Sequence, residues 1–260
     1  WITLLTWNPD APISRPKSGT ALSWDHSDSI YALLGAAYAD TGINARYYFY
    51  RYSILANSWV RLADSPYAQG AGDAVAWSGY DNTVYALLGN NVHGTFFARY
   101  SPVTNTWETL PFNPSWTLTD DGASLVWTGG EYLYALSGEW EETKPHNDFA
   151  RYHIPTRTWK DMTPIPVTNG VGDGASLLWV GNWISQYSNY IFALGGNDVL
   201  ENPGYDFYYY SVTDDKWTGL EPLPHPVGYY TGNRLGFASG HIYYWQGAPS
   251  TWDGSGTAFY

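Results

Sequence analysis

Cysteine is absent from the sequence, which excludes disulfide bridges, thiolate metal sites and cysteine nucleophiles. No apolar run approaches the roughly 18 residues of a membrane-spanning helix, so membrane insertion is not expected. Basic residues are scarce: 12 Lys and Arg stand against 24 Asp and Glu, for a formal net charge of −12. Such an acidic chain repels phosphate backbones and anionic lipids, so we expect no nucleic-acid partner.

Aromatic residues and turn formers are abundant instead. The 260 residues include 15 Trp, 24 Tyr, 27 Gly and 16 Pro, whereas only 14% of them are charged. This composition is typical of a turn-rich all-β protein. The shortage of lysine, the absence of cysteine and the many Tyr and Trp residues together favour an extracellular or cell-surface location.

The strongest signal in the chain is an internal repeat. In each copy a glycine precedes an aromatic residue by five positions, and the five aromatic residues are Trp24, Trp77, Trp127, Trp179 and Phe237. A run such as Tyr-Ala-Leu-Leu-Gly follows. Four copies then carry a tyrosine seven positions before a second tryptophan: Tyr52/Trp59, Tyr100/Trp107, Tyr152/Trp159 and Tyr210/Trp217. The copies recur roughly every 50 residues, which is the range of a propeller blade.

Each copy accommodates four short strands, so the sequence predicts an all-β, five-bladed β-propeller of four-stranded antiparallel blades. We expect a single domain over residues 1–260, with blades at approximately 19–66, 72–114, 122–166, 174–224 and 232–260 plus 1–7. The fifth copy lacks its last strand, and the N-terminal Trp-Ile-Thr-Leu matches that strand in other copies. Pairing of this segment in the last blade would close the ring and remove free strand edges.

This pattern resembles the kelch-type β-propeller family. The resemblance rests on the Tyr-x-x-x-Gly strand end, the later tyrosine, the six-residue turn and the second tryptophan, and it covers essentially the whole chain. A complete glycine doublet occurs at Gly195–Gly196. The resemblance implies a ring of blades, although many members of that family have six or seven blades.

Residues that recur in every blade are predicted to pack between blades rather than to bind a ligand. This applies to both repeated tryptophan positions, and the glycine before the first of them is expected to allow close backbone approach near the axis. Function must then come from residues that do not repeat. In a blade whose first strand is innermost, the second-to-third loops and the inter-blade loops share one face, and these are the long, variable loops.

Aromatic and acidic residues that break the repeat lie on these loops, and we expect them to bind the ligand. The candidates are Trp116, Trp140, Tyr229, Tyr230, Trp252, Asp120, Asp121, Asp173 and Asp253. For the aromatic residues the alternative is packing of the loops on themselves. Asp73, Asp121 and Asp173 stand at or just before an innermost strand, where they would either hold Ca²⁺ or bond the backbone of local turns. No other cofactor is expected.

Catalytic motifs are scarce. The sequence has no His-Glu-x-x-His, Gly-x-Ser-x-Gly, Walker or dinucleotide-binding motif. We therefore expect a non-enzymatic recognition domain that binds a glycan or a protein, with the glycan favoured because flat aromatic side chains are mixed with Asp, Asn and Glu. One alternative is a glycan-cleaving or sugar-modifying enzyme that uses paired axial carboxylates. Another is a structural or docking domain of a surface assembly, joined to other domains of a longer chain.

Overall fold

The secondary structure is almost entirely β. The computed structural model describes residues 19–34, 48–70, 72–90, 94–116, 119, 122–138, 146–168, 170–196, 204–225, 227, 234–246 and 258–259. Within them the helical element is one 3-10 turn, η2 (Ser185–Tyr187). No helix in this part of the chain is long and apolar enough to cross a membrane.

Consecutive strands form antiparallel sheets, four of them with four strands and one with three. The first sheet contains β1 (Ala21–Trp24), β2 (Ser29–Leu33), β3 (Phe49–Ser53) and β4 (Ser58–Arg61). The second contains β5 (Ala74–Ser78), β6 (Thr83–Asn90), β7 (Gly94–Ser101) and β8 (Thr106–Leu110). The third contains β9 (Ser124–Trp127), β10 (Tyr132–Leu136), β11 (Phe149–His153) and β12 (Thr158–Asp161). The fourth contains β13 (Ser176–Trp179), β14 (Tyr190–Leu194), β15 (Phe207–Ser211) and β16 (Lys216–Gly219), and the fifth β17 (Arg234–Ala238), β18 (His241–Gln246) and β19 (Ala258–Phe259).

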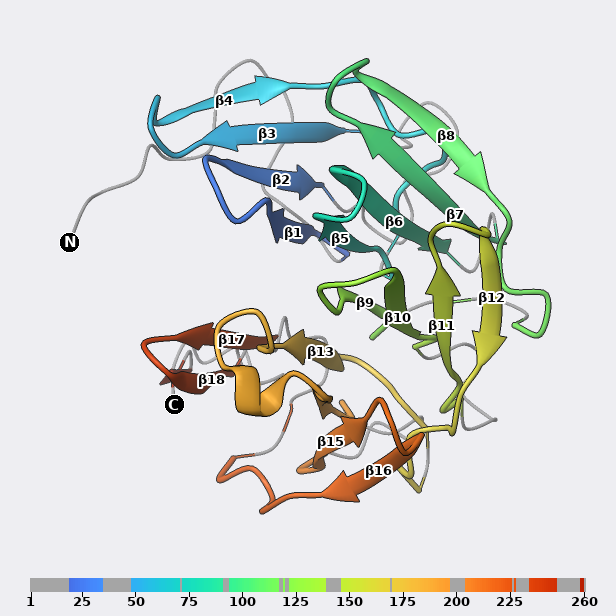
Figure 1. Cartoon of the computed structure of the whole chain (residues 1–260), viewed down its shortest axis with the longest axis vertical. Helices are drawn as coiled ribbons and strands as arrows, with labels where there is room; N and C mark the ends of the chain where they lie inside the picture. The colour runs from blue at the N-terminus through green and yellow to red at the C-terminus, as the bar shows by residue number, and fades with distance from the viewer. Residues whose placement is uncertain are drawn as a thin grey trace, which may run out of the picture.

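The sheets are arranged as blades around a common centre, with the first strand of each blade on the inside (Figure 1). These innermost strands contact one another in series, from β1 to β5, β9, β13 and β17. The prediction of an all-β fold built from five antiparallel sheets is therefore confirmed. Residues 1–7, which we expected to complete the fifth blade, lie outside the described residues, so closure of the ring stays a prediction.

The second strand of each blade is apolar almost without interruption because both of its faces are buried. In β6, Tyr85 and Leu87 pack toward the third blade, whereas Val84, Ala86 and Leu88 pack toward the first. Successive side chains of a strand point to opposite faces. A strand that packs against a neighbouring blade on each face therefore needs apolar residues at odd and even positions alike. This explains the repeated Tyr-Ala-Leu-Leu run.

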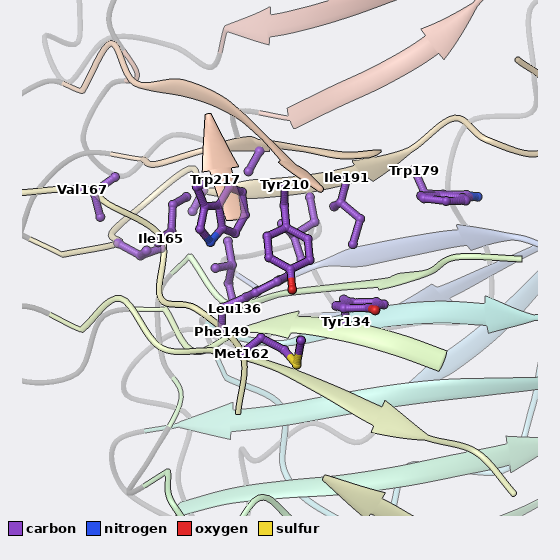
Figure 2. Packing of buried hydrophobic residues seen from close by; sticks show 14 residues of the cluster. Tyr134, Leu136, Phe149, Met162, Ile165, Val167, Trp179, Ile191, Tyr210 and Trp217 are labelled. Carbon is purple, nitrogen blue, oxygen red and sulfur yellow. The ribbon is translucent and has the colours of Figure 1, made fainter. Parts of the chain in front are cut away.

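Repeated aromatic residues form the core between blades (Figure 2). Phe149 of the third blade is met edge-on by Tyr210 and Trp217 of the fourth, with ring centroids 4.8 and 4.9 Å away. The same arrangement recurs in two other interfaces, Phe49 with Tyr100 and Trp107, and Phe97 with Tyr152 and Trp159. The predicted packing role of these tryptophans is confirmed.

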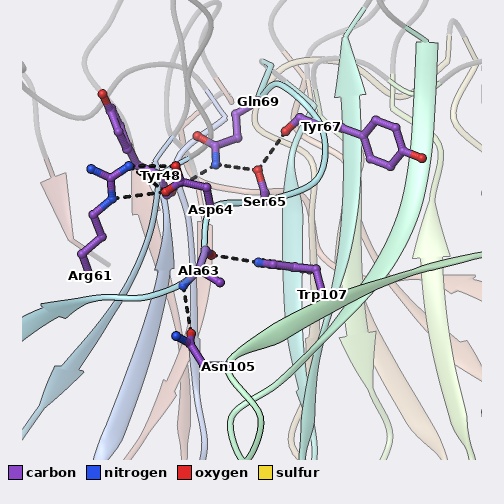
Figure 3. A network of polar contacts seen from close by, with 9 residues as sticks. All are labelled: Tyr48, Arg61, Ala63, Asp64, Ser65, Tyr67, Gln69, Asn105 and Trp107. Atoms are coloured by element: carbon purple, nitrogen blue, oxygen red, sulfur yellow. Dashed lines mark hydrogen bonds and ion pairs between the residues drawn. The ribbon is translucent and has the colours of Figure 1, made fainter.

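A set of hydrogen bonds, which we call the inter-blade clamp, fixes the outer strand of the second blade to the first blade (Figure 3). The Asn105 side-chain oxygen accepts bonds from the Ala63 amide (2.9 Å) and the Tyr100 hydroxyl (2.8 Å). The Trp107 indole donates to the Ala63 carbonyl at 3.0 Å. In the fourth blade the same bonds join Asp215 to Thr163 and Tyr210, and Trp217 to Thr163.

The third blade carries an altered clamp. Arg157 occupies the position of Asn105 and Asp215, and all three share a left-handed backbone, with φ of 57°, 53° and 50°. The Tyr152 hydroxyl is accordingly buried without a hydrogen-bond partner. In the second and fourth blades the equivalent side chain also accepts a hydrogen bond from a backbone amide of the preceding blade. Here the corresponding residue of the preceding blade is Pro111, which has no amide hydrogen to donate. Only the indole bond remains there, from Trp159 to the Pro111 carbonyl at 2.9 Å.

Candidate functional site

The strand order gives the blades two different ends. At the loop end, second strands lead into third strands and each fourth strand leads into the next blade. At the turn end, first strands turn into second strands. Asp73 lies at the loop end, buried, and its carboxylate accepts hydrogen bonds from the amides of Gly70 (3.2 Å) and Gly89 (3.1 Å). It therefore bonds local backbone, which was the structural alternative to a metal ligand.

Glycines let the backbone pack tightly at the loop end. Gly122 has a φ of +81°, and a Cβ there would lie 2.0 Å from the carbonyl oxygen of Gly172 in the neighbouring inter-blade loop. A Cβ on Gly196 would lie 2.3 Å from the same oxygen and 2.9 Å from that of Asp173. The prediction that the glycine before the innermost strand permits close backbone approach is confirmed at Gly122. Asp173 itself is buried in this packing, with 8% of its surface exposed.

Trp116 does not have the exposure that we expected of a ligand-binding residue. It is 6% exposed and packs between blades, 6.0 Å from the Trp159 ring and 6.1 Å from Phe112. Asn113 turns the loop inward: its side chain bonds the Ser115 amide (3.0 Å) and Asp161 (2.8 Å). The expectation of an exposed Trp116 is wrong, because this loop packs on itself and on the third blade.

The other predicted site residues lie outside the described part of the chain. They are Trp140, Tyr229, Tyr230, Trp252, Asp120, Asp121 and Asp253. Among the residues that are described, no group of three His, Asp or Glu side chains is placed to hold a metal ion. Arg234, which the sequence analysis did not single out, opens β17 and donates to the Ala175 carbonyl of the fourth blade at 3.3 Å.

At the turn end, aromatic side chains surround a cavity of ≈240 Å³, which we call the axial aromatic cavity. Four of its walls are the tryptophans that end the innermost strands, Trp24, Trp77, Trp127 and Trp179. His26, Asn182 and Trp183 add walls from two hairpins. Sequence reasoning assigned the tryptophans to packing alone and missed the hairpin residues. The available signal was the long connection from β13 to β14, which breaks the pattern of short hairpins at this end.

The hairpin residues join the first and fourth blades across the axis. The His26 ring lies edge-on to Trp24 at 5.1 Å and to Trp183 at 5.3 Å. Trp183 in turn stacks on Phe237 of the fifth blade at 5.4 Å. Partial burial lowers the pKa of His26, against the raising effect of Asp25, so the imidazole is neutral at pH 7. His26 also has a φ of 62°, a left-handed conformation that is uncommon for a residue other than glycine.

A larger cavity of ≈470 Å³ lies between the fourth and fifth blades, lined by Phe192, Tyr209 and Ile242 among others. In the preceding interfaces the third-strand tyrosine of the next blade lies at this place, as Tyr210 does 6.0 Å from Tyr134. In the fifth blade the third strand is described only at Ala258–Phe259. The larger cavity therefore has the position of an inter-blade core rather than that of a ligand site.

Among the comparisons with known proteins, the one with solved structures bears on the fold. No protein-family model matches the chain, and no curated protein matches it either. Among 464 matching chains of solved structures is that of YjhT, with a TM-score of 0.64 and 18% identity over 93% of this chain and 75% of the YjhT chain. A likeness at this identity shows the fold alone. Together with the sheet layout it supports a β-propeller.

Proposed function

We propose that this chain is a non-enzymatic recognition domain, located outside the cell or at its surface, that binds a glycan or a protein through its loop end. The observation that carries the proposal is the strand order, which puts the second-to-third loops and the inter-blade loops at one end of all the sheets. These connections differ between blades in length and sequence, whereas the repeated aromatic residues of the third and fourth strands pack between blades. Variable loops on a rigid scaffold are where binding groups are usually placed.

A glycan is the favoured ligand because the variable loops mix aromatic and acidic residues. Trp140, Tyr229, Tyr230 and Trp252 offer flat apolar area with little loss of conformational entropy, as binding aromatics do. Asp120, Asp121 and Asp253 would orient hydroxyl groups or, with Asp173, supply the hard oxygen donors that Ca²⁺ prefers. Trp116 is left out of this proposal because it is buried.

The proposal is tested with a glycan array and a peptide array, each probed with and without Ca²⁺. Against the best ligand, the variants Trp252→Ala and Tyr229→Ala/Tyr230→Ala are expected to weaken binding at least about tenfold, in line with the loss of aromatic anchors. Tyr80→Ala is the matched control, since Tyr80 is an exposed aromatic residue of a turn-end hairpin, 47% exposed. Its affinity should equal that of the unchanged protein.

Two outcomes would overturn the proposal. If the loop variants bind as tightly as the Tyr80→Ala control, the ligand does not use the loop end. If Asp121→Asn or Asp173→Asn keeps ligand affinity but abolishes turnover of a bound glycan, the chain is a sugar-active enzyme instead.

A further inference from the structure

We propose that the axial aromatic cavity at the turn end is a second binding site, which takes a single neutral sugar residue. It lies at the opposite end of the blades from the loops, so it does not depend on the function proposed above. Its walls come from four blades, and each innermost strand ends there in a tryptophan. Two of its aromatic walls remain open to solvent: Trp24 is 42% exposed and Trp183 is 46% exposed.

The size and polarity of the cavity indicate a small uncharged ligand. Its ≈240 Å³ is below the roughly 300–1,000 Å³ of sites for drug-sized molecules. None of its described lining residues is Asp, Glu, Lys or Arg. A charged group would lose its hydration there without gaining an opposite charge, which is costly. The ligand therefore has to present apolar surface to the indoles and no ionised group.

One polar side chain in the wall favours an oxygen-bearing ligand. Asn182 lines the cavity and is exposed, so its amide can donate a hydrogen bond to a ligand and accept one from it. The indole nitrogen of Trp179 is buried and lies out of reach of a ligand in the cavity. A sugar hydroxyl would bond the Asn182 amide while the apolar face of its ring packs on tryptophan, whereas a hydrocarbon ligand would make no hydrogen bond with this amide.

The hairpin residues bring further groups to the cavity wall. The His26 ring contacts Trp24 and Trp183, which come from different blades. The Asn182 side chain lies beside Gly129, where a Cβ would come within 2.5 Å of its Oδ1 atom. Asn182 thus adds an amide, with one donor group and one acceptor oxygen, to the cavity wall.

The experiment uses an array of neutral oligosaccharides built from glucose, galactose, mannose, fucose and N-acetylglucosamine, followed by calorimetry with the tightest binder. Trp24→Ala and Trp183→Ala are each expected to weaken binding at least about tenfold. Asn182→Ala, which removes the amide, should weaken it about three- to tenfold. In ¹H–¹⁵N spectra the indole signal of the exposed Trp24 should shift on binding. Tyr80→Ala, an exposed aromatic residue of the same end outside the cavity, serves as the unaffected control.

Several outcomes would overturn the inference. One is the absence of binding to every neutral oligosaccharide of the array, and another is binding that Trp24→Ala and Trp183→Ala leave unchanged. Loss of binding with Trp252→Ala but not with Trp24→Ala would place the ligand at the loop end instead. Because Trp24→Ala could alter the fold, Trp24→Phe and a melting curve accompany it; if the melting temperature falls while sugar affinity in the folded fraction is kept, the tryptophans only pack.

Discussion

The inter-blade clamp predicts unequal costs for the same change at equivalent positions. In Asn105→Gly the side-chain acceptor of the Ala63 amide and of the Tyr100 hydroxyl is lost. Each bond contributes about 0.5–1.5 kcal/mol net, and a buried hydroxyl left unpaired costs about 1–3 kcal/mol. Tyr100 is buried, with 1% of its surface exposed, but Asn105 is exposed, so water reaches the two donors when its side chain is removed. We expect Asn105→Gly to lower the free energy of unfolding by about 1–3 kcal/mol, the net contribution of two hydrogen bonds.

Arg157→Gly is the matched control. Glycine suits the left-handed backbone of both residues, φ 53° and 57°, so the conformational effect of the substitution is shared. Arg157 supports neither Tyr152, whose hydroxyl is already unpartnered, nor Pro111, which has no amide hydrogen. It loses only its ion pair with Glu108, in which both side chains are nearly half exposed, and such pairs are worth about 0–1 kcal/mol.

Urea unfolding at equilibrium, followed by tryptophan fluorescence, measures both changes if the transition is two-state. Asn105→Gly should cost about 1–2 kcal/mol more than Arg157→Gly. Arg157→Asn should be more stable than Arg157→Gly by about 1 kcal/mol, because the new side chain accepts the Tyr152 hydroxyl. Equal costs for the two glycine variants would refute the clamp as a source of stability.

Two further predictions concern the whole ring and its pH dependence. Deletion of residues 1–7 should leave the fifth blade with an unpaired edge and cause aggregation or a large drop in melting temperature; an unchanged melting curve would contradict closure by the N-terminal segment. For Asp215, burial raises the pKa of the carboxyl group, but the hydrogen bonds from Tyr210 and Thr163 together lower it by a larger amount. The net pKa is therefore below the ordinary value. The stabilising contribution of the Asp215 carboxylate is present above the unfolded-state pKa of about 3.9 and is lost as pH falls through the folded-state pKa. Between about pH 5 and pH 3, Asp215→Asn should therefore lose less stability than the unchanged protein.

The sequence by itself determined the strand content, the number of repeats and most of the packing residues. Strand pairing and blade packing act at fixed local spacing, so the Gly-to-Trp and Tyr-to-Trp intervals mark them directly. The pairing of Tyr52 with Trp59 and of Tyr100 with Trp107 in the structure follows that spacing. Even the altered clamp is visible in the chain, as Arg157 together with Pro111, once the role of Asn105 is known.

Tertiary structure decided which aromatic residues are exposed. Trp116 broke the repeat and still packs against Trp159, because the path of an irregular loop depends on long-range contacts such as that of Asn113 with Asp161. Trp24 follows the repeat and is nevertheless 42% exposed, because the burial of a side chain at the edge of a blade depends on which side chains the neighbouring blade places against it. The axial aromatic cavity likewise combines residues more than 150 positions apart, such as His26 and Trp183 at 5.3 Å, and no local spacing encodes such a meeting.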